Sequence, residues 1–222
     1  MLLSGCVCNS AAVISTSGEI SEEARFKNDI LLLLTGWLSL NSGWVVLSKN
    51  LQFMQTEAAF LESSIKKFRF QKNLGDKTFA QLEDKDLFFK PSAESNSIAI
   101  IVQHMTGNML SRWTNFLTED GEKPWRERDK EFEDVFETRE QVLSAWNKGW
   151  DCVLNAMESL KADDLLKTIL IRHESMSVID AVIRQIDHYG YHTGQIVLIG
   201  KIIRDNHWQT LSIPKGRSSE FK

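Results

Sequence analysis

Two histidines, His188 and His192, have the spacing of a metal-binding pair. In an α-helix, side chains four residues apart lie one turn apart on the same face, so two imidazole nitrogens can approach a single ion. Apolar residues recur at spacings of three and four across residues 177–204, which predicts a helix over that range. The pair is therefore a candidate for two ligands of a metal ion. The alternative is that both are core or surface residues satisfied by hydrogen bonds.

A third histidine, His104, lies in another segment with helical periodicity, residues 98–117. It follows Ile101 by three residues and precedes Asn108 by four, so it points into or beside the core. A lone histidine in such a place is more often a hydrogen-bonded core residue than a ligand. Opposite a helix that carries His188 and His192, it becomes the candidate third ligand.

The helices that must position these histidines follow from the apolar pattern after residue 53. A first helix begins near Met54 and carries an apolar face up to Leu82. The second helix, residues 98–117, can be capped by Asn96 or Ser97. A third is predicted from the capping box at residues 138–141 to about residue 160, and the fourth covers residues 177–204.

The connections between these helices are long. Residues 118–140 carry ten acidic and five basic side chains, and we expect a solvated loop that Trp125, Phe132 and Phe136 anchor to the bundle. Residues 161–176 are expected to form a short extended hairpin, with His173 on the surface. Such lengths permit crossovers, so the sequence leaves the order of helix directions open.

Four helical patterns and no strand-rich block predict an all-α protein, a four-helix bundle over residues 54–210 with a flexible tail at 211–222. The bundle core is a place where side chains from facing helices assemble metal sites. Residues 1–53 have a different composition and are read as an extension of uncertain structure, disordered or helical. Residues 29–47 are nearly apolar enough for a membrane span, but we favour a poorly ordered extension or a natural start near Met54.

Composition excludes one class of function and indicates a compartment. The chain is 42% hydrophobic and 25% charged, with a formal net charge of −4, which argues against nucleic-acid binding by phosphate neutralisation. Three cysteines, Cys6, Cys8 and Cys152, form neither an even framework nor a C-x-x-C pair. A reducing, cytoplasmic setting is the expectation.

The residues around the histidines resemble a known superfamily. His104 in an Ile-Val-Gln-His-Met setting and the later segment His-Tyr-Gly-Tyr-His-Thr-Gly-Gln are similar to the DinB/YfiT-like metal-binding four-helix bundles, closest to a subgroup of unassigned function. A Gly-Glu-Lys-Pro-Trp-Arg loop like residues 121–126 also occurs in that subgroup. The resemblance covers roughly residues 54–204 and implies that His104, His188 and His192 are the metal ligands.

Three neutral imidazoles would leave the charge of a divalent ion uncompensated and one or more coordination positions open, which favours chemistry over a structural role. Zn²⁺ or Ni²⁺ are the expected ions, and Fe²⁺ or Mn²⁺ also accept such ligands. The resemblance implies a small-molecule hydrolase or a transferase that uses a low-molecular-weight thiol, and dimerisation is a family-level expectation. The alternative is a non-catalytic bundle that binds a metal or another ligand.

Candidate helper residues are those near the histidines in sequence. Gln103, Asn108, Tyr191 and Gln195 could orient ligands or bind substrate. Gln195 is the strongest of these, because it follows His192 by three residues on the same helix face. Asp187 is weaker, since neighbours on a helix point about 100° apart. No acidic residue is clearly placed as a general base, which slightly favours activation of a thiolate over activation of water.

Overall fold

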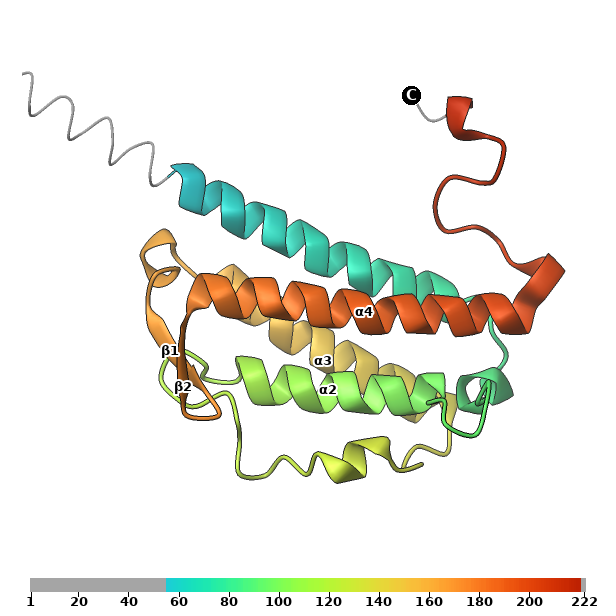
Figure 1. Ribbon diagram of the computed structural model, residues 1–222, viewed down its shortest axis with the longest axis horizontal. Helices are drawn as coiled ribbons and strands as arrows, with labels where there is room; N and C mark the ends of the chain where they lie inside the picture. Colours follow the sequence, from blue (N-terminus) through green and yellow to red (C-terminus); the bar gives the residue numbers. More distant parts are fainter. Residues whose placement is uncertain (1–54, 221–222) are drawn as a thin grey trace, which may run out of the picture. The chain divides into compact units, whose positions relative to one another are not determined.

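Four long helices form where the apolar periodicity predicts them, and together they make an all-α four-helix bundle (Figure 1). The computed structural model describes residues 55–220. The chain divides into two units, Met1–Phe53 and Met54–Lys222. The predictions made for residues 1–53 lie outside the described residues. The first helix covers residues 55–79, and it is followed by α2 (Ile98–Trp113), α3 (Arg139–Ser159) and α4 (Val178–Arg204).

Local capping explains where the helices start. The Ser97 hydroxyl accepts a hydrogen bond from the Ile100 N–H at the start of α2, and the Ser177 hydroxyl caps α4. Thr138 and Gln141 form the predicted capping box of α3. The second helix was predicted to reach residue 117 but ends at Trp113, because Asn115 adopts a left-handed backbone with φ of 49°.

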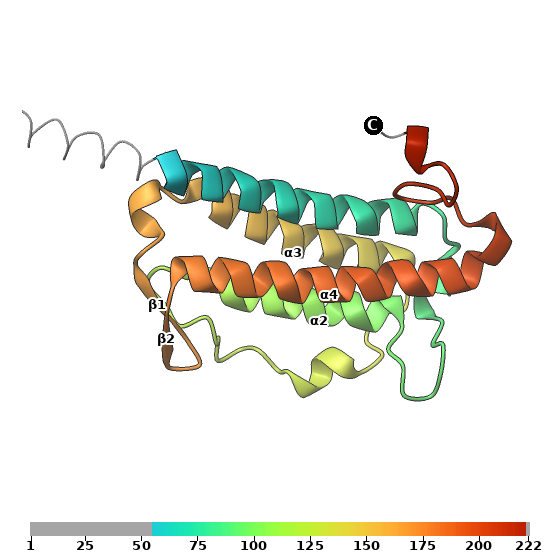
Figure 2. The ribbon, with the colours of Figure 1, turned by 45° about the horizontal axis from the view of Figure 1, so that its top comes forward.

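The connection between α2 and α3 fixes the order of helix directions, which the sequence left open. Residues 114–138 return along the outside of the bundle, so that α2 and α3 run in the same direction (Figure 2). The helix of residues 55–79 and α4 run in the opposite direction (Figure 1). As a result, α2 and α4 are antiparallel neighbours, and the returning connection covers α2.

Aromatic side chains from all four helices meet in the core. Phe68 is fully buried, and its ring lies 6.2 Å from Trp113 of α2, 6.3 Å from Trp150 of α3 and 5.9 Å from Tyr189 of α4. Tyr189 accepts a hydrogen bond from the Trp113 indole and donates one to the Asn108 side chain. Because this cluster fixes Tyr189, it also fixes the turn of α4 on which His188 lies.

The predicted hairpin is present as two short antiparallel strands, β1 (Thr168–Ile171) and β2 (Glu174–Ser177). The two residues between them, Arg172 and His173, have positive φ angles of 58° and 64°. Two such residues at a hairpin tip match a type I′ turn, which normally favours Gly or Asn. The Asp120 carboxylate accepts hydrogen bonds from both backbone N–H groups and so compensates for the unusual conformation.

Short 3₁₀ helices fill the connections. They are η1 (Asp84–Phe88), η2 (Asp129–Phe132), η3 (Ala162–Asp164), η4 (Asp205–His207) and η5 (Ser218–Glu220). In the described part of the chain, no helix is both long and apolar enough to cross a membrane.

The way in which residues 118–140 attach to the bundle differs from the prediction. Trp125 and Phe132, expected as apolar anchors, are about half exposed, and Phe136 alone of the three packs against the core. The segment is held instead by polar contacts with α2. The buried Glu131 carboxylate bonds His104, and the Gly121 carbonyl accepts a hydrogen bond from the Ser111 hydroxyl. An apolar pattern could not reveal these anchors, because buried charges in a loop look like solvated ones in the sequence.

Candidate metal centre

The three predicted ligands lie together between α2 and α4. The Nε2 atom of His188 is 3.3 Å from Nε2 of His104 and 3.1 Å from Nε2 of His192. One nitrogen from each residue lies within 4.8 Å of the other two. Two nitrogens that bind one Zn²⁺ at about 2.1 Å with tetrahedral angles are about 3.4 Å apart. The spacing of the two close pairs therefore fits a shared divalent ion.

Each histidine is held by a hydrogen bond on its other nitrogen. The Nδ1 atom of His104 is 2.9 Å from Glu131, that of His188 is 3.3 Å from the Gln185 side-chain oxygen, and that of His192 is 2.8 Å from the Gln195 side-chain oxygen. An acceptor at Nδ1 places the proton there and leaves the lone pair on Nε2. Three Nε2 lone pairs that face one another repel unless a cation lies between them, so the donor set fits a metal ion.

The surroundings of His188 and His192 favour their neutral form. Burial, followed by the neighbouring His192, His104 and Arg126, lowers the pKa of His188 from 6.5 to about 3. Burial also lowers the pKa of His192. Metal binding needs deprotonated imidazole nitrogens. These two ligands are therefore in the required protonation state at neutral pH.

Glu131 orients His104 and was not found by sequence reasoning. Its carboxylate accepts two hydrogen bonds from Arg126, at 2.7 and 2.9 Å, besides the one from His104. Burial would raise the pKa of Glu131, but Arg126 and His104 outweigh it and hold the pKa below its usual value. A Cβ at Gly107 would overlap the Glu131 carboxylate, so only glycine leaves room for it here. Glu131 lies in a loop without periodicity, and no sequence signal singled it out.

The predicted helper residues lie in different places. Gln195 contacts His192 as described, and Tyr191 lies with its ring 5.0 Å from that of His192. Asn108 is buried and accepts the hydrogen bond from Tyr189. Gln103 points elsewhere and donates to the backbone carbonyls of Lys130 and Glu133, which ties the returning connection to α2.

Two further neighbours of the histidines, Gln185 and Phe132, were not identified from the sequence. Gln185 is 2% exposed, and its side-chain oxygen holds the Nδ1 atom of His188, three residues after it. Gln195 holds His192 in the same way but follows its histidine by three residues. The same i±3 argument that identified Gln195 would have found Gln185. Phe132 stacks on His104, with 4.9 Å between ring centres. Phe132 therefore covers the ligand rather than anchoring the loop in the core.

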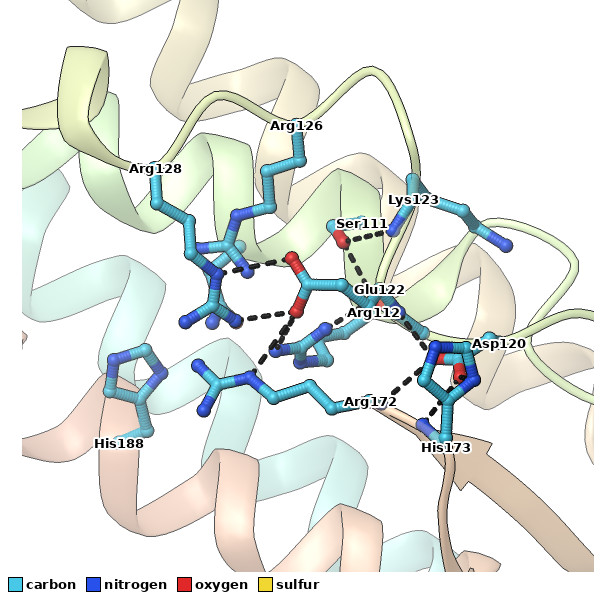
Figure 3. Close-up of polar contacts among 12 residues, drawn as sticks. Ser111, Arg112, Asp120, Glu122, Lys123, Arg126, Arg128, Arg172, His173 and His188 are labelled. Atoms are coloured by element: carbon cyan, nitrogen blue, oxygen red, sulfur yellow. Dashed lines mark hydrogen bonds and ion pairs between the residues drawn. The ribbon is translucent and has the colours of Figure 1, made fainter.

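Two of the three histidines, His104 and His188, open onto a pocket of about 400 Å³. His104, His188, Asn108, Asp187 and Tyr191 contribute to its wall. Gln185 and five arginines line the remainder; the arginines are Arg112, Arg126, Arg128, Arg172 and Arg184. Figure 3 shows four of them gathered around Glu122, with His188 facing the group. The arginines come from α2, the returning connection, the hairpin tip and α4, so the helical pattern alone could not bring them together.

Comparison with known proteins gives a family without assigned activity. No curated protein matches the sequence. A family model described as "Protein of unknown function (DUF1572)" matches residues 55–217, which is most of the chain and contains all four helices and the three histidines. The chain therefore belongs to the DUF1572 family.

Proposed function

We propose that this protein is a divalent-metal-dependent enzyme with an open three-histidine site, either a thiol-dependent transferase or a small-molecule hydrolase. The observation that carries the proposal is the convergence of three Nε2 atoms whose Nδ1 partners, Glu131, Gln185 and Gln195, all hold the rings in the ligand orientation. Zn²⁺ or Ni²⁺ suits the donor set best, with Fe²⁺ or Mn²⁺ as further candidates.

A catalytic role is favoured over a structural one by what surrounds the histidines. A structural site is closed by its protein ligands, whereas three histidines leave a position for a substrate or water. That position would face the pocket, whose wall contains His104 and His188. The aromatic cluster around Phe68 joins the four helices through apolar contacts that involve none of the three histidines. The fold therefore has a core that does not depend on a metal.

The bound ion would lower the pKa of a thiol or a water molecule at the open position. Glu131 is not free to accept a proton from that position, because its oxygens are engaged by Arg126 and by the Nδ1 side of His104. Activation of a thiolate needs no protein base, so the transferase is the favoured reading. For hydrolysis, Asp187 is the carboxylate at the pocket wall.

The superfamily resemblance supports a low-molecular-weight thiol as co-substrate and a homodimer as the assembly. The lack of a cysteine framework supports a cytoplasmic setting. Metal or ligand binding without catalysis is the second candidate, supported by the three-histidine group itself, which could hold an ion without any further residue.

The deciding experiment measures metal content by mass spectrometry on the purified full chain, together with thermal unfolding. The test variant changes His188 and His192 to Ala, and the matched control changes the exposed residues His173 and His207 to Ala. We expect about one divalent ion per chain in the wild type and the control, none in the test variant, and a folded bundle in all three.

A thiol screen with electrophilic acceptors then separates the two candidates. Thiol consumption that disappears in the test variant supports the transferase. A wild type that takes up no ion when divalent metals are supplied contradicts the metal centre. A bundle that loads the ion but unfolds when it is removed contradicts the open catalytic site and supports a structural metal.

A further inference from the structure

The pocket beside the three histidines has an unusual wall for a chain whose net charge is negative. Five arginines line it, against a single carboxylate, Asp187. Arginine presents a planar fork of N–H donors that matches the oxygens of a carboxylate or a phosphate. A concentration of arginines at one concave site in an otherwise acidic protein is a feature that the metal centre alone does not explain.

Two glutamates next to the pocket, Glu122 and Glu131, pair with four of these arginines but do not accept hydrogen bonds from all of their N–H groups. Glu122 forms ion pairs with Arg112, Arg128 and Arg172, at 3.3, 2.6 and 3.3 Å. Glu131 is paired with Arg126. One glutamate is thus shared among three guanidinium groups, which leaves N–H donors on that cluster available.

Two arginines retain unused donors. The Arg126 side chain is 2% exposed, yet its Nη1 atom is buried and has no hydrogen-bond partner among the described residues. The unpaired N–H shows that Glu131 does not satisfy the whole guanidinium group, whose positive charge adds to the electrostatic potential at the pocket wall. Arg184 has no carboxylate partner within the described part of the chain, and it lies on the exposed face of α4 at the pocket rim.

The arginines are also positioned by the fold. Arg112 is 4% exposed and donates to the Gly121 carbonyl as well as to Glu122. Arg172 is delivered by the hairpin tip, whose two left-handed residues are held by Asp120 (Figure 3). Backbone conformations of this kind persist where the surrounding structure enforces them, and they concentrate at functional sites. The strained backbone of the hairpin tip therefore places the Arg172 guanidinium at the pocket.

We propose that this pocket binds the oxyanion group of a small molecule, a carboxylate or a phosphate, next to the three histidines. Arg184 supplies free donors. Arg112, Arg126, Arg128 and Arg172 supply positive charge that Glu122 and Glu131 only partly neutralise. A volume of about 400 Å³ admits a small molecule and not a polymer. The anion site stands on its own. The orientation of the bound molecule toward a metal ion rests on the function proposed above.

The experiment titrates the full chain by calorimetry with inorganic phosphate and, separately, with succinate, at an ionic strength held constant with potassium chloride. Each titration is made with the protein loaded with Zn²⁺ and after chelation. The test variants are Arg184→Gln and Arg128→Gln, because both residues are partly or fully exposed and neither is needed by the core. The matched control is Arg69→Gln, an exposed arginine of the first helix that pairs with Glu158.

We expect saturable binding of at least one anion at one site per chain. Each test variant should weaken it about tenfold, since Arg184→Gln removes a charge-assisted contact and Arg128→Gln removes positive charge from the pocket wall, and the control should leave it unchanged. Tighter binding of phosphate assigns the natural ligand to the phosphates, and tighter binding of succinate assigns it to the carboxylates.

The proposal is overturned if neither anion binds to a single site in the wild type, or if Arg69→Gln weakens binding as much as Arg184→Gln. Binding after chelation tests the anion site independently of the metal centre. If the chain loads no metal but still binds the anion through Arg184, the metal-dependent function fails and the anion site stands. If it loads metal and binds no anion, the anion site fails and the proposed metal-dependent function stands.

Discussion

At the scale of single residues, the candidate centre depends on groups that never touch the open position. Glu131, Gln185 and Gln195 each accept a hydrogen bond from one histidine ring and so decide which nitrogen faces the others. Glu131 differs from the two glutamines because it carries a charge and is itself held by Arg126. It therefore makes His104 a stronger electron donor than a neutral acceptor would.

Replacing Glu131 by Gln tests this role. We expect the affinity for Zn²⁺ to fall by about tenfold or more, because partners of ligating histidines typically contribute that much. A competition titration against a chromophoric chelator measures the affinity. Glu133→Gln is the control, since Glu133 lies exposed two residues away in the same connection. Equal affinities of wild type and Glu131→Gln would show that Glu131 serves only to hold the loop.

At the scale of elements, the sequence predicted what depends on local chemistry. The helix starts at Thr138 and at Ser97, one of two candidate caps, followed from capping patterns, and the hairpin followed from the pattern of residues 161–176. The placement of His188 and His192 on one face of α4 followed from a spacing of four. Each of these features is decided within a few residues of the chain.

Other features of the elements could not be predicted because they arise from contacts between distant segments. The shared direction of α2 and α3 depends on where the returning connection docks. That docking relies on buried polar groups such as Glu131, which the sequence does not distinguish from the solvated charges around it. The pocket arginines lie on four different elements, and Asp120 fixes a hairpin tip that is 52 residues away.

The contact between Asp120 and the hairpin tip gives a prediction at this scale. Changing Asp120 to Ala removes the acceptor of two N–H groups at left-handed residues, so we expect the free energy of unfolding to fall by about 1–3 kcal/mol. Urea denaturation followed by circular dichroism measures it. Asp163→Ala is the control, because Asp163 is exposed. A loss of the same size in both variants would mean that the carboxylate does not support the turn.

At the scale of the whole molecule, the buried histidines link stability to pH. The pKa of His188 is about 3 in the folded chain and about 6.5 when unfolded, so the unfolded chain binds more protons between these values. The stability of the metal-free protein should therefore fall as the pH is lowered from 6.5 toward 3. His192, whose pKa is also lowered, acts in the same direction.

This dependence can be measured by urea denaturation of the chelated full chain at several pH values between 7 and 4.5. His188→Gln removes one of the groups that must stay uncharged. We expect its stability to decline less steeply with falling pH than that of the wild type. Parallel curves for the two proteins would contradict the lowered pKa of His188.

The returning connection between α2 and α3 has a consequence for the order of folding events. His104 and His188 are 84 residues apart in the sequence, and Glu131 reaches His104 only after the chain between α2 and α3 has doubled back along the bundle. In an unfolded chain, only His188 and His192 of the three are close together in sequence. Loop closure must come before His104 joins them, so an ion that needs all three histidines would be captured in the last step of folding. Such an ion would lower the unfolding rate of the bundle without raising its folding rate.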